Sequence, residues 1–380
     1  MNQNWQLPDY TADLLPEQAC RIEDARLHVL TLFRSYGYAP VCPPLMEYGT
    51  SLLTHTDAGL SRKTLRLTDP VNGRQLGIRA DITPQLARID AHLLGRGGGV
   101  NRLCYSAPVL HAYPDGLLTT REPFQTGAEL YGCADVAADI EVIELMLKTM
   151  QTAYQDGVIL ALGHLGVFRA LAQAACLNAE QSGELLALMQ SKDRAAVAAL
   201  SESWQLDGVW AQALAALPEL YGGRELLNTA RARLPHTAAV LRALDELAAV
   251  CAAFPEQAVH IDLADVRVDP YHSGLLYAAY VPEHHDAVAR GGRYDGLGGH
   301  FGQARPATGF SFDLKLFGSR LNTAPPPAVS VRQQDYAAAR EAVERLRGEG
   351  VAVCIDYGTA DNAAARLVCE DGEWVVRQAA

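Results

Sequence analysis

Gln125 and Glu129 lie four positions apart in the segment that runs from Thr120 to Glu129 with the sequence TREPFQTGAE. Residues at even spacing share one face of an extended strand, so both side chains and Gly127 would point the same way, with the glycine leaving room for a ligand. A carboxylate and an amide on one face suit an ammonium group or an imidazole N–H. Spacing alone favours the alternative of an edge strand whose polar face lies in solvent.

Asp81 and Thr83 come where a predicted strand ends and a predicted helix begins. Aspartate and threonine are typical helix N-cap residues. Both side chains could also contact the amine of a ligand, and the two roles do not exclude each other.

Arg267 precedes another predicted strand, where it could stabilise an anion or pair with Asp265 or Asp269. The glycine-rich stretch 291–299 would let the backbone approach a ligand closely, although glycine also simply makes turns. Within it, Arg293 could pair with Asp295.

We expect no metal and no catalytic residues. The acidic and histidine-rich segment 283–286 has no second cluster of ligands at metal-site spacing. No serine, cysteine, histidine and aspartate residues form a recognisable nucleophile constellation.

Several elements must position these side chains. Strands that are separated by short turns favour an antiparallel sheet, and no Gly-x-Gly-x-x-Gly follows a strand, so a doubly wound fold with a dinucleotide cofactor is disfavoured. Apolar spacing, prolines and glycines predict helices at 16–36, 82–94 and 135–155, and strands at 65–68, 75–79, 101–109, 259–263 and 275–281.

The composition predicts a division into four parts. Alanine and leucine dominate between 165 and 254, which indicates an all-helical insertion. The insertion interrupts a domain formed by residues 1–164 and 255–323. A proline-rich linker, 324–327, then leads to a small α/β unit at 328–380.

Charge and cysteine content restrict the partners. With 32 basic and 44 acidic residues, the net charge of −12 lacks the footprint for holding a nucleic-acid backbone. No apolar stretch is long enough to span a bilayer. The eight cysteines form no Cys-x-x-Cys pair, which favours reduced thiols in a cytoplasmic protein.

Taken together, these segments resemble the catalytic domain of histidyl-tRNA synthetase, a class II aminoacyl-tRNA synthetase. The resemblance is carried by segment 120–129, by GGRYDGL at 291–297 and by TGFSFDL at 308–314. It implies an α+β fold with a six-stranded antiparallel sheet flanked by helices. It also implies a histidine site in which Asp81, Thr83 and Gln125 hold the α-ammonium, Glu129 and either Tyr271 or His272 meet the imidazole ring, and Arg267 acts on the carboxylate.

The sequence departs from the synthetase at the residues that should hold ATP. His111 and Leu316 stand where the family has arginines, and neither replaces a guanidinium that grips phosphate through two hydrogen bonds. The tail after Pro327 also looks too short for a full anticodon-binding domain. An amino-acid pocket without a phosphate clamp suggests binding without chemistry.

A synthetase-like chain with these losses is similar to the regulatory subunits of short-form ATP phosphoribosyltransferases, and segment 116–123 (GLLTTREP) resembles that family most closely. The resemblance implies a separate catalytic subunit as partner, a hetero-octamer, and L-histidine as the feedback ligand. Two alternatives remain: a working histidyl-tRNA synthetase and a free-standing amino-acid-binding module.

Overall fold

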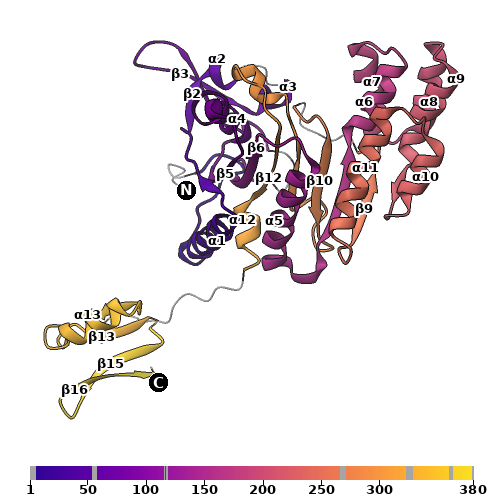
Figure 1. The fold of residues 1–380 in the computed structure, drawn as a ribbon. Helices are drawn as coiled ribbons and strands as arrows, with labels where there is room; N and C mark the ends of the chain where they lie inside the picture. Colours follow the sequence, from indigo (N-terminus) through magenta and orange to yellow (C-terminus); the bar gives the residue numbers. More distant parts are fainter. Residues whose placement is uncertain are drawn as a thin grey trace. The chain divides into compact units, whose positions relative to one another are not determined.

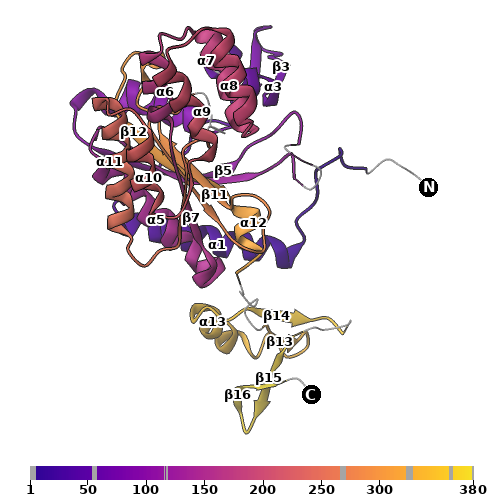
Figure 2. The same cartoon turned by 90° about the vertical axis from the view of Figure 1, so that its right-hand side faces the viewer.

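The computed structural model describes residues 6–53, 58–114, 116, 119–265, 271–321, 328–358 and 363–378. The chain forms two compact units, Met1–Leu321 and Asn322–Ala380 (Figures 1 and 2). The predicted linker 324–327 and the candidate Arg267 lie outside the described residues.

A nine-stranded sheet forms the centre of the first unit. The strand order is β1 (Ala39–Pro40), β5 (Asn101–Pro108), β6 (Phe124–Tyr131), β12 (Ala307–Asp313), β11 (Ala289–Arg293), β10 (Leu275–Tyr280), β7 (Ile159–His164), β9 (Val259–Asp262) and β8 (Tyr221–Gly222). Six neighbouring strands in the middle of the sheet pair antiparallel. Two parallel pairs flank them: β1 with β5 at one end, and β9 with β7 near the other. The predicted α+β class and antiparallel sheet are confirmed, but three edge strands raise the count from six to nine.

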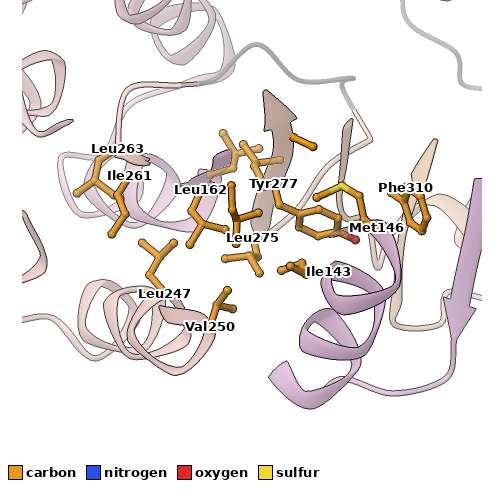
Figure 3. Close-up of a cluster of buried hydrophobic side chains, with 14 of the residues drawn as sticks. Ile143, Met146, Leu162, Leu247, Val250, Ile261, Leu263, Leu275, Tyr277 and Phe310 are labelled. Carbon is orange, nitrogen blue, oxygen red and sulfur yellow. The ribbon is translucent and has the colours of Figure 1, made fainter. Parts of the chain in front are cut away.

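One face of this sheet packs against helices. The helix α5 starts as predicted, because the Asp135 side chain accepts a hydrogen bond from the Ala137 N–H. Side chains such as Ile143 and Met146 of α5, and Leu247 of a second helix, pack on the strands (Figure 3). The helices that contribute to this core include α1 (Pro16–Ser35), α5 (Val136–Tyr154), α11 (Ala238–Ala253) and α12 (Leu314–Gly318).

The opposite face carries a smaller core around α4 (Thr83–Ile89). Ile82 and Leu86 pack there against Tyr105 and Tyr131, which alternate along their strands with residues of the first core. The predicted helix 82–94 is α-helical only to Ile89 and continues as a π-helical turn, Asp90–Leu94. Beside it lie α2 (Gly49–Leu52), α3 (Ala58–Lys63) and a small sheet of β2 (Met46–Tyr48), β4 (Gln75–Ile78) and β3 (Leu65–Thr68).

Between β7 and β9 the chain makes a series of helices that group together in Figure 1. Side chains that favour N-caps begin them: Asn178, Asp193, Asp207 and Thr237 each accept a hydrogen bond from a first-turn N–H. The segment is not wholly helical, because Tyr221 and Gly222 form β8. The helices before α11 are α6 (Leu165–Ala174), α7 (Ala179–Gln190), α8 (Arg194–Ser203), α9 (Gly208–Ala216) and α10 (Leu226–Arg233).

The second unit is a four-stranded sheet with one helix. In the predicted α/β unit, the strand-like segment 328–331, the helix-like segment 336–348 and the strand-like segment 351–356 correspond to β13 (Val329–Arg332), α13 (Arg340–Gly348) and β14 (Val353–Asp356). The sequence interpretation missed the hairpin of β15 (Ala365–Glu370) and β16 (Glu373–Gln378). Its signal was Asp371-Gly372, whose positive φ angles of 50° and 87° suit a tight hairpin turn. In the part of the chain that the structure describes, no helix is long and apolar enough to cross a membrane.

Candidate functional site

A pocket of about 420 Å³ opens on the sheet face that carries α4. The structure brings six of the seven predicted site residues together around it; the seventh, Arg267, lies outside the described residues. The alternative of an edge strand is wrong, because β6 lies between β5 and β12. The six predicted residues that line the pocket are Asp81, Thr83, Gln125, Glu129, Tyr271 and His272.

Asp81 is the centre of one polar side of the pocket. Its Oδ1 accepts hydrogen bonds from Gln125 Nε2 at 2.8 Å and from the Thr83 N–H at 3.1 Å. Its Oδ2 accepts one from the Tyr271 hydroxyl at 3.2 Å. Gln125 Oε1 in turn accepts from the Ile82 N–H at 2.9 Å. Asp81 therefore accepts from the first N–H of α4 and also fixes two pocket side chains, although the N-cap position itself is Ile82 and has no side-chain cap.

Glu129 lies deeper, with 1% of its surface exposed. The Thr83 hydroxyl donates to Oε1 at 2.9 Å, and the Tyr105 hydroxyl lies 3.4 Å from the same oxygen. The Tyr294 hydroxyl donates to Oε2 through a short hydrogen bond. Burial raises the pKa of Glu129 to about 8, although these hydroxyl donors oppose the shift. Near neutral pH this carboxyl group is therefore partly protonated, and an N–H donor or a cation in the pocket would favour its ionised form.

This pKa gives a stability prediction for the ligand-free chain. From the ordinary pKa of 4.5 up to about 8, the folded chain keeps a proton that the unfolded chain loses. Stability should thus fall as pH rises through this window, by at most about 1.4 kcal/mol per pH unit. Glu129→Gln removes the titration, so its stability relative to wild type should increase with pH. Urea unfolding of both proteins across the window tests this, and a pH-independent difference would contradict it.

Gly309 and Gly291 line the pocket, whereas Gly127 of the neighbouring strand does not. A Cβ on Gly309, which is paired with Glu129, would lie 1.5 Å from the carboxylate Oε2, so this glycine makes room for the acid. The expectation that Gly127 leaves room for a ligand is wrong, because a Cβ there would lie 2.7 Å from the Tyr105 hydroxyl oxygen. Gly291 belongs to β11, and the Tyr277 ring fills the space beside it.

Sequence reasoning missed the two tyrosines that contact Glu129. Tyr294 was visible within GGRYDGL but had no assigned partner. Tyr105 lies opposite Gly127 in the β5–β6 register, and such a large–small pair becomes apparent only once the register is known. The predicted pair of Arg293 and Asp295 exists at 3.2 Å, yet Arg293 pairs more closely with the buried Asp139, at 2.5 Å.

The two positions without arginine have structural surroundings of their own. His111 is buried at the pocket wall, with Nε2 3.1 Å from the Ala80 carbonyl oxygen. Leu316 lies on α12 and packs against the main hydrophobic core. Neither side chain supplies a guanidinium to the pocket. Among the residues described, no three histidine, cysteine or acidic side chains are grouped to hold a metal ion.

Comparisons with known proteins agree with this geometry. The family model described as histidyl-tRNA synthetase matches residues 10–316. The ATP phosphoribosyltransferase regulatory subunit of Neisseria meningitidis serogroup C (strain FAM18) is 62% identical over 379 residues, covering 98% of this chain and 99% of the relative.

Solved structures show the same fold. An ATP phosphoribosyltransferase regulatory subunit/histidyl-tRNA synthetase from Bacillus halodurans is 26% identical with a TM-score of 0.82, and the match covers 94% of each chain. An ATP phosphoribosyl transferase complex from Thermotoga maritima contains a chain that is 20% identical, with a TM-score of 0.59. That match covers 80% of this chain and 98% of the other, and at this identity it shows the fold alone. By its identity to curated relatives along nearly its whole length, this chain belongs to the family of ATP phosphoribosyltransferase regulatory subunits.

Proposed function

We propose that this chain is the non-catalytic regulatory subunit of a short-form ATP phosphoribosyltransferase, which serves the first step of histidine biosynthesis and makes it sensitive to histidine. One observation carries the proposal: the chain keeps a pocket lined by Asp81, Gln125 and Glu129, but it has His111 and Leu316 where a synthetase would need arginines for ATP. Lys63 and Arg290 line the pocket, but without the guanidinium groups at these two positions it suits binding rather than adenylate chemistry.

L-Histidine fits the polar groups that the pocket presents. Asp81 and Gln125 offer a carboxylate and an amide to the α-ammonium. A hydrogen bond of 2.8 Å from Gln125 Nε2 to Asp81 Oδ1 already orients the two side chains. Glu129 offers a buried acceptor to an imidazole N–H, beside the rings of Tyr271 and His272. In this proposal Arg267 acts on the ligand carboxylate.

The proposed partner is a separate catalytic subunit that carries out the transferase reaction. Support comes from the relatives named as regulatory subunits and from the Thermotoga maritima structure, which is described as a complex. We propose a hetero-octamer with that partner. In it, residues 1–164 and 255–323 would carry the pocket, while the insertion 165–254 and the unit 328–380 would form separate parts.

Two assays on purified protein test the proposal. The isolated chain should give no histidine-dependent exchange of pyrophosphate into ATP and no transferase turnover. Mixed with a short-form catalytic subunit, it should co-purify and make the transferase sensitive to histidine. Exchange activity that follows this chain through purification would favour a working synthetase instead. Histidine binding with no association to the catalytic subunit would favour the free-standing module.

A further inference from the structure

Arg169 lies on α6, the first helix after β7, and reaches out of its helix toward the pocket segment. Its Nη2 donates a hydrogen bond to the His272 carbonyl oxygen at 2.7 Å, and its Nη1 donates to the Ser273 carbonyl oxygen at 3.2 Å. These two carbonyls directly follow Tyr271, whose side chain lines the pocket. One guanidinium therefore fixes the backbone that carries two pocket rings.

The position of that backbone determines the aromatic wall of the pocket. The Tyr271 ring lies 5.0 Å from the His272 ring and 5.7 Å, edge to face, from the Tyr294 ring. Tyr271 also donates to Asp81, and Tyr294 donates to Glu129. A shift of the backbone at Tyr271 and His272 would thus disturb Asp81 and Glu129, the two acids that we propose contact histidine.

Other bonds hold the segment independently of Arg169. The Ser273 N–H donates to the Arg293 carbonyl oxygen at 2.7 Å, and the Leu165 N–H donates to the Gly274 carbonyl oxygen at 3.0 Å. A Cβ on Gly292 would lie 2.6 Å from His272 Cδ2, so the imidazole ring rests against β11. Removing Arg169 should release the two carbonyls without detaching β10 from the sheet.

We propose that Arg169 is a positioning residue that couples the helices of the insertion to the ligand pocket. The inference rests on the proposed function, in which histidine occupies this pocket. When a ligand contacts the Tyr271 ring, the effect is transmitted through the His272 and Ser273 carbonyls to Arg169 and α6. In return, a contact at the protein surface that displaces Arg169 changes the affinity for histidine. The Arg169 side chain suits such a contact because the residue is exposed.

The test uses the full-length chain with Arg169→Ala, Arg169→Lys and a control, Arg231→Ala. Arg231 is another arginine of the insertion, on α10, and pairs with Asp245 at 2.5 Å. In calorimetry, Arg169→Ala should weaken histidine binding roughly tenfold, since two hydrogen bonds from a charged group are lost. Arg169→Lys, which keeps one donor position, should give an intermediate affinity, and the control should match wild type.

Hydrogen exchange separates positioning from a loss of structure. Histidine should slow amide exchange of α6 in wild type and in the control. In Arg169→Ala it should still slow exchange in β6 but leave α6 unchanged. If the wild-type chain binds histidine and both Arg169 variants bind it with the same affinity, this inference is overturned and the proposed function stands. No histidine binding to the wild-type chain would overturn both.

Discussion

Glu129→Gln is expected to weaken histidine binding at least tenfold. The variant keeps the shape of the side chain but removes the charge that an imidazole N–H would meet in a buried site, and losing a charge-assisted hydrogen bond costs on the order of 1.5–3 kcal/mol. Gln125→Ala should have a similar effect through the α-ammonium, because Gln125 also orients Asp81. Calorimetry of each variant against wild type measures the effect.

The matched control is Glu219→Gln, which changes an acid that is paired with surface arginines away from the pocket. In the complex with the catalytic subunit, the histidine concentration for half-inhibition should rise with Glu129→Gln in proportion to the loss of affinity. Linkage also requires that bound transferase substrates weaken histidine binding by the factor by which histidine weakens theirs. Full sensitivity to histidine in a complex whose regulatory subunit no longer binds it would place feedback on the catalytic subunit.

Arg305→Ala is expected to lower the free energy of unfolding by about 3–5 kcal/mol, because it leaves a buried charge without its partner. Arg305 Nη1 donates to both oxygens of Asp90, at 2.8 and 2.9 Å, and Asp90 is 2% exposed. The Arg305 side chain passes so close to Gly95 and Gly132 that a Cβ on either would lie 2.4 or 2.3 Å from the guanidinium nitrogens. Urea unfolding followed by circular dichroism measures the loss.

A surface pair provides the control for this prediction. Arg194 pairs with Glu219 at 2.5 Å, but 59% of the Arg194 side chain is exposed, so Arg194→Ala should cost less than about 1 kcal/mol. Equal effects of the two substitutions would show that burial of the Arg305–Asp90 pair does not matter for stability.

Local patterns predicted the regular elements well. The strands around the turn at 69–73, the Asp135 cap and the helices between β7 and β9 all follow from residues that are close in sequence. The edge strands were harder to predict, because β1 and β8 are two residues long and have no pattern of their own. The π-helical turn after Ile89 also has no local sequence signal; there Asp90 bonds to Arg305, more than two hundred residues away.

The same distinction applies to the site. Gln125 and Glu129 could be placed on one face from spacing alone, and the synthetase resemblance added Asp81, Thr83, Tyr271 and His272. The tyrosine hydroxyls on Glu129 and the use of Gly309 depend on strand register, which one sequence does not specify. Arg169 lies outside every motif, because its partners are backbone carbonyls and these leave no trace in residue types.

The parallel pairing of β7 with β9 changes the topological description of the insertion. The chain leaves β7 at His164, touches the edge of the sheet at β8, and returns on β9 beside β7, with Leu160 opposite Val259. Such a strand–helix–strand path is a crossover connection, and α11, which packs on β7 and β10, is its covering helix. The helices α7 to α10 are then an excursion from this connection, interrupted between α9 and α10 by β8, which pairs with β9. Because buried side chains of these helices belong to the same hydrophobic core as the sheet strands, the excursion is part of that core, and shortening it would remove packed apolar surface as well as chain length.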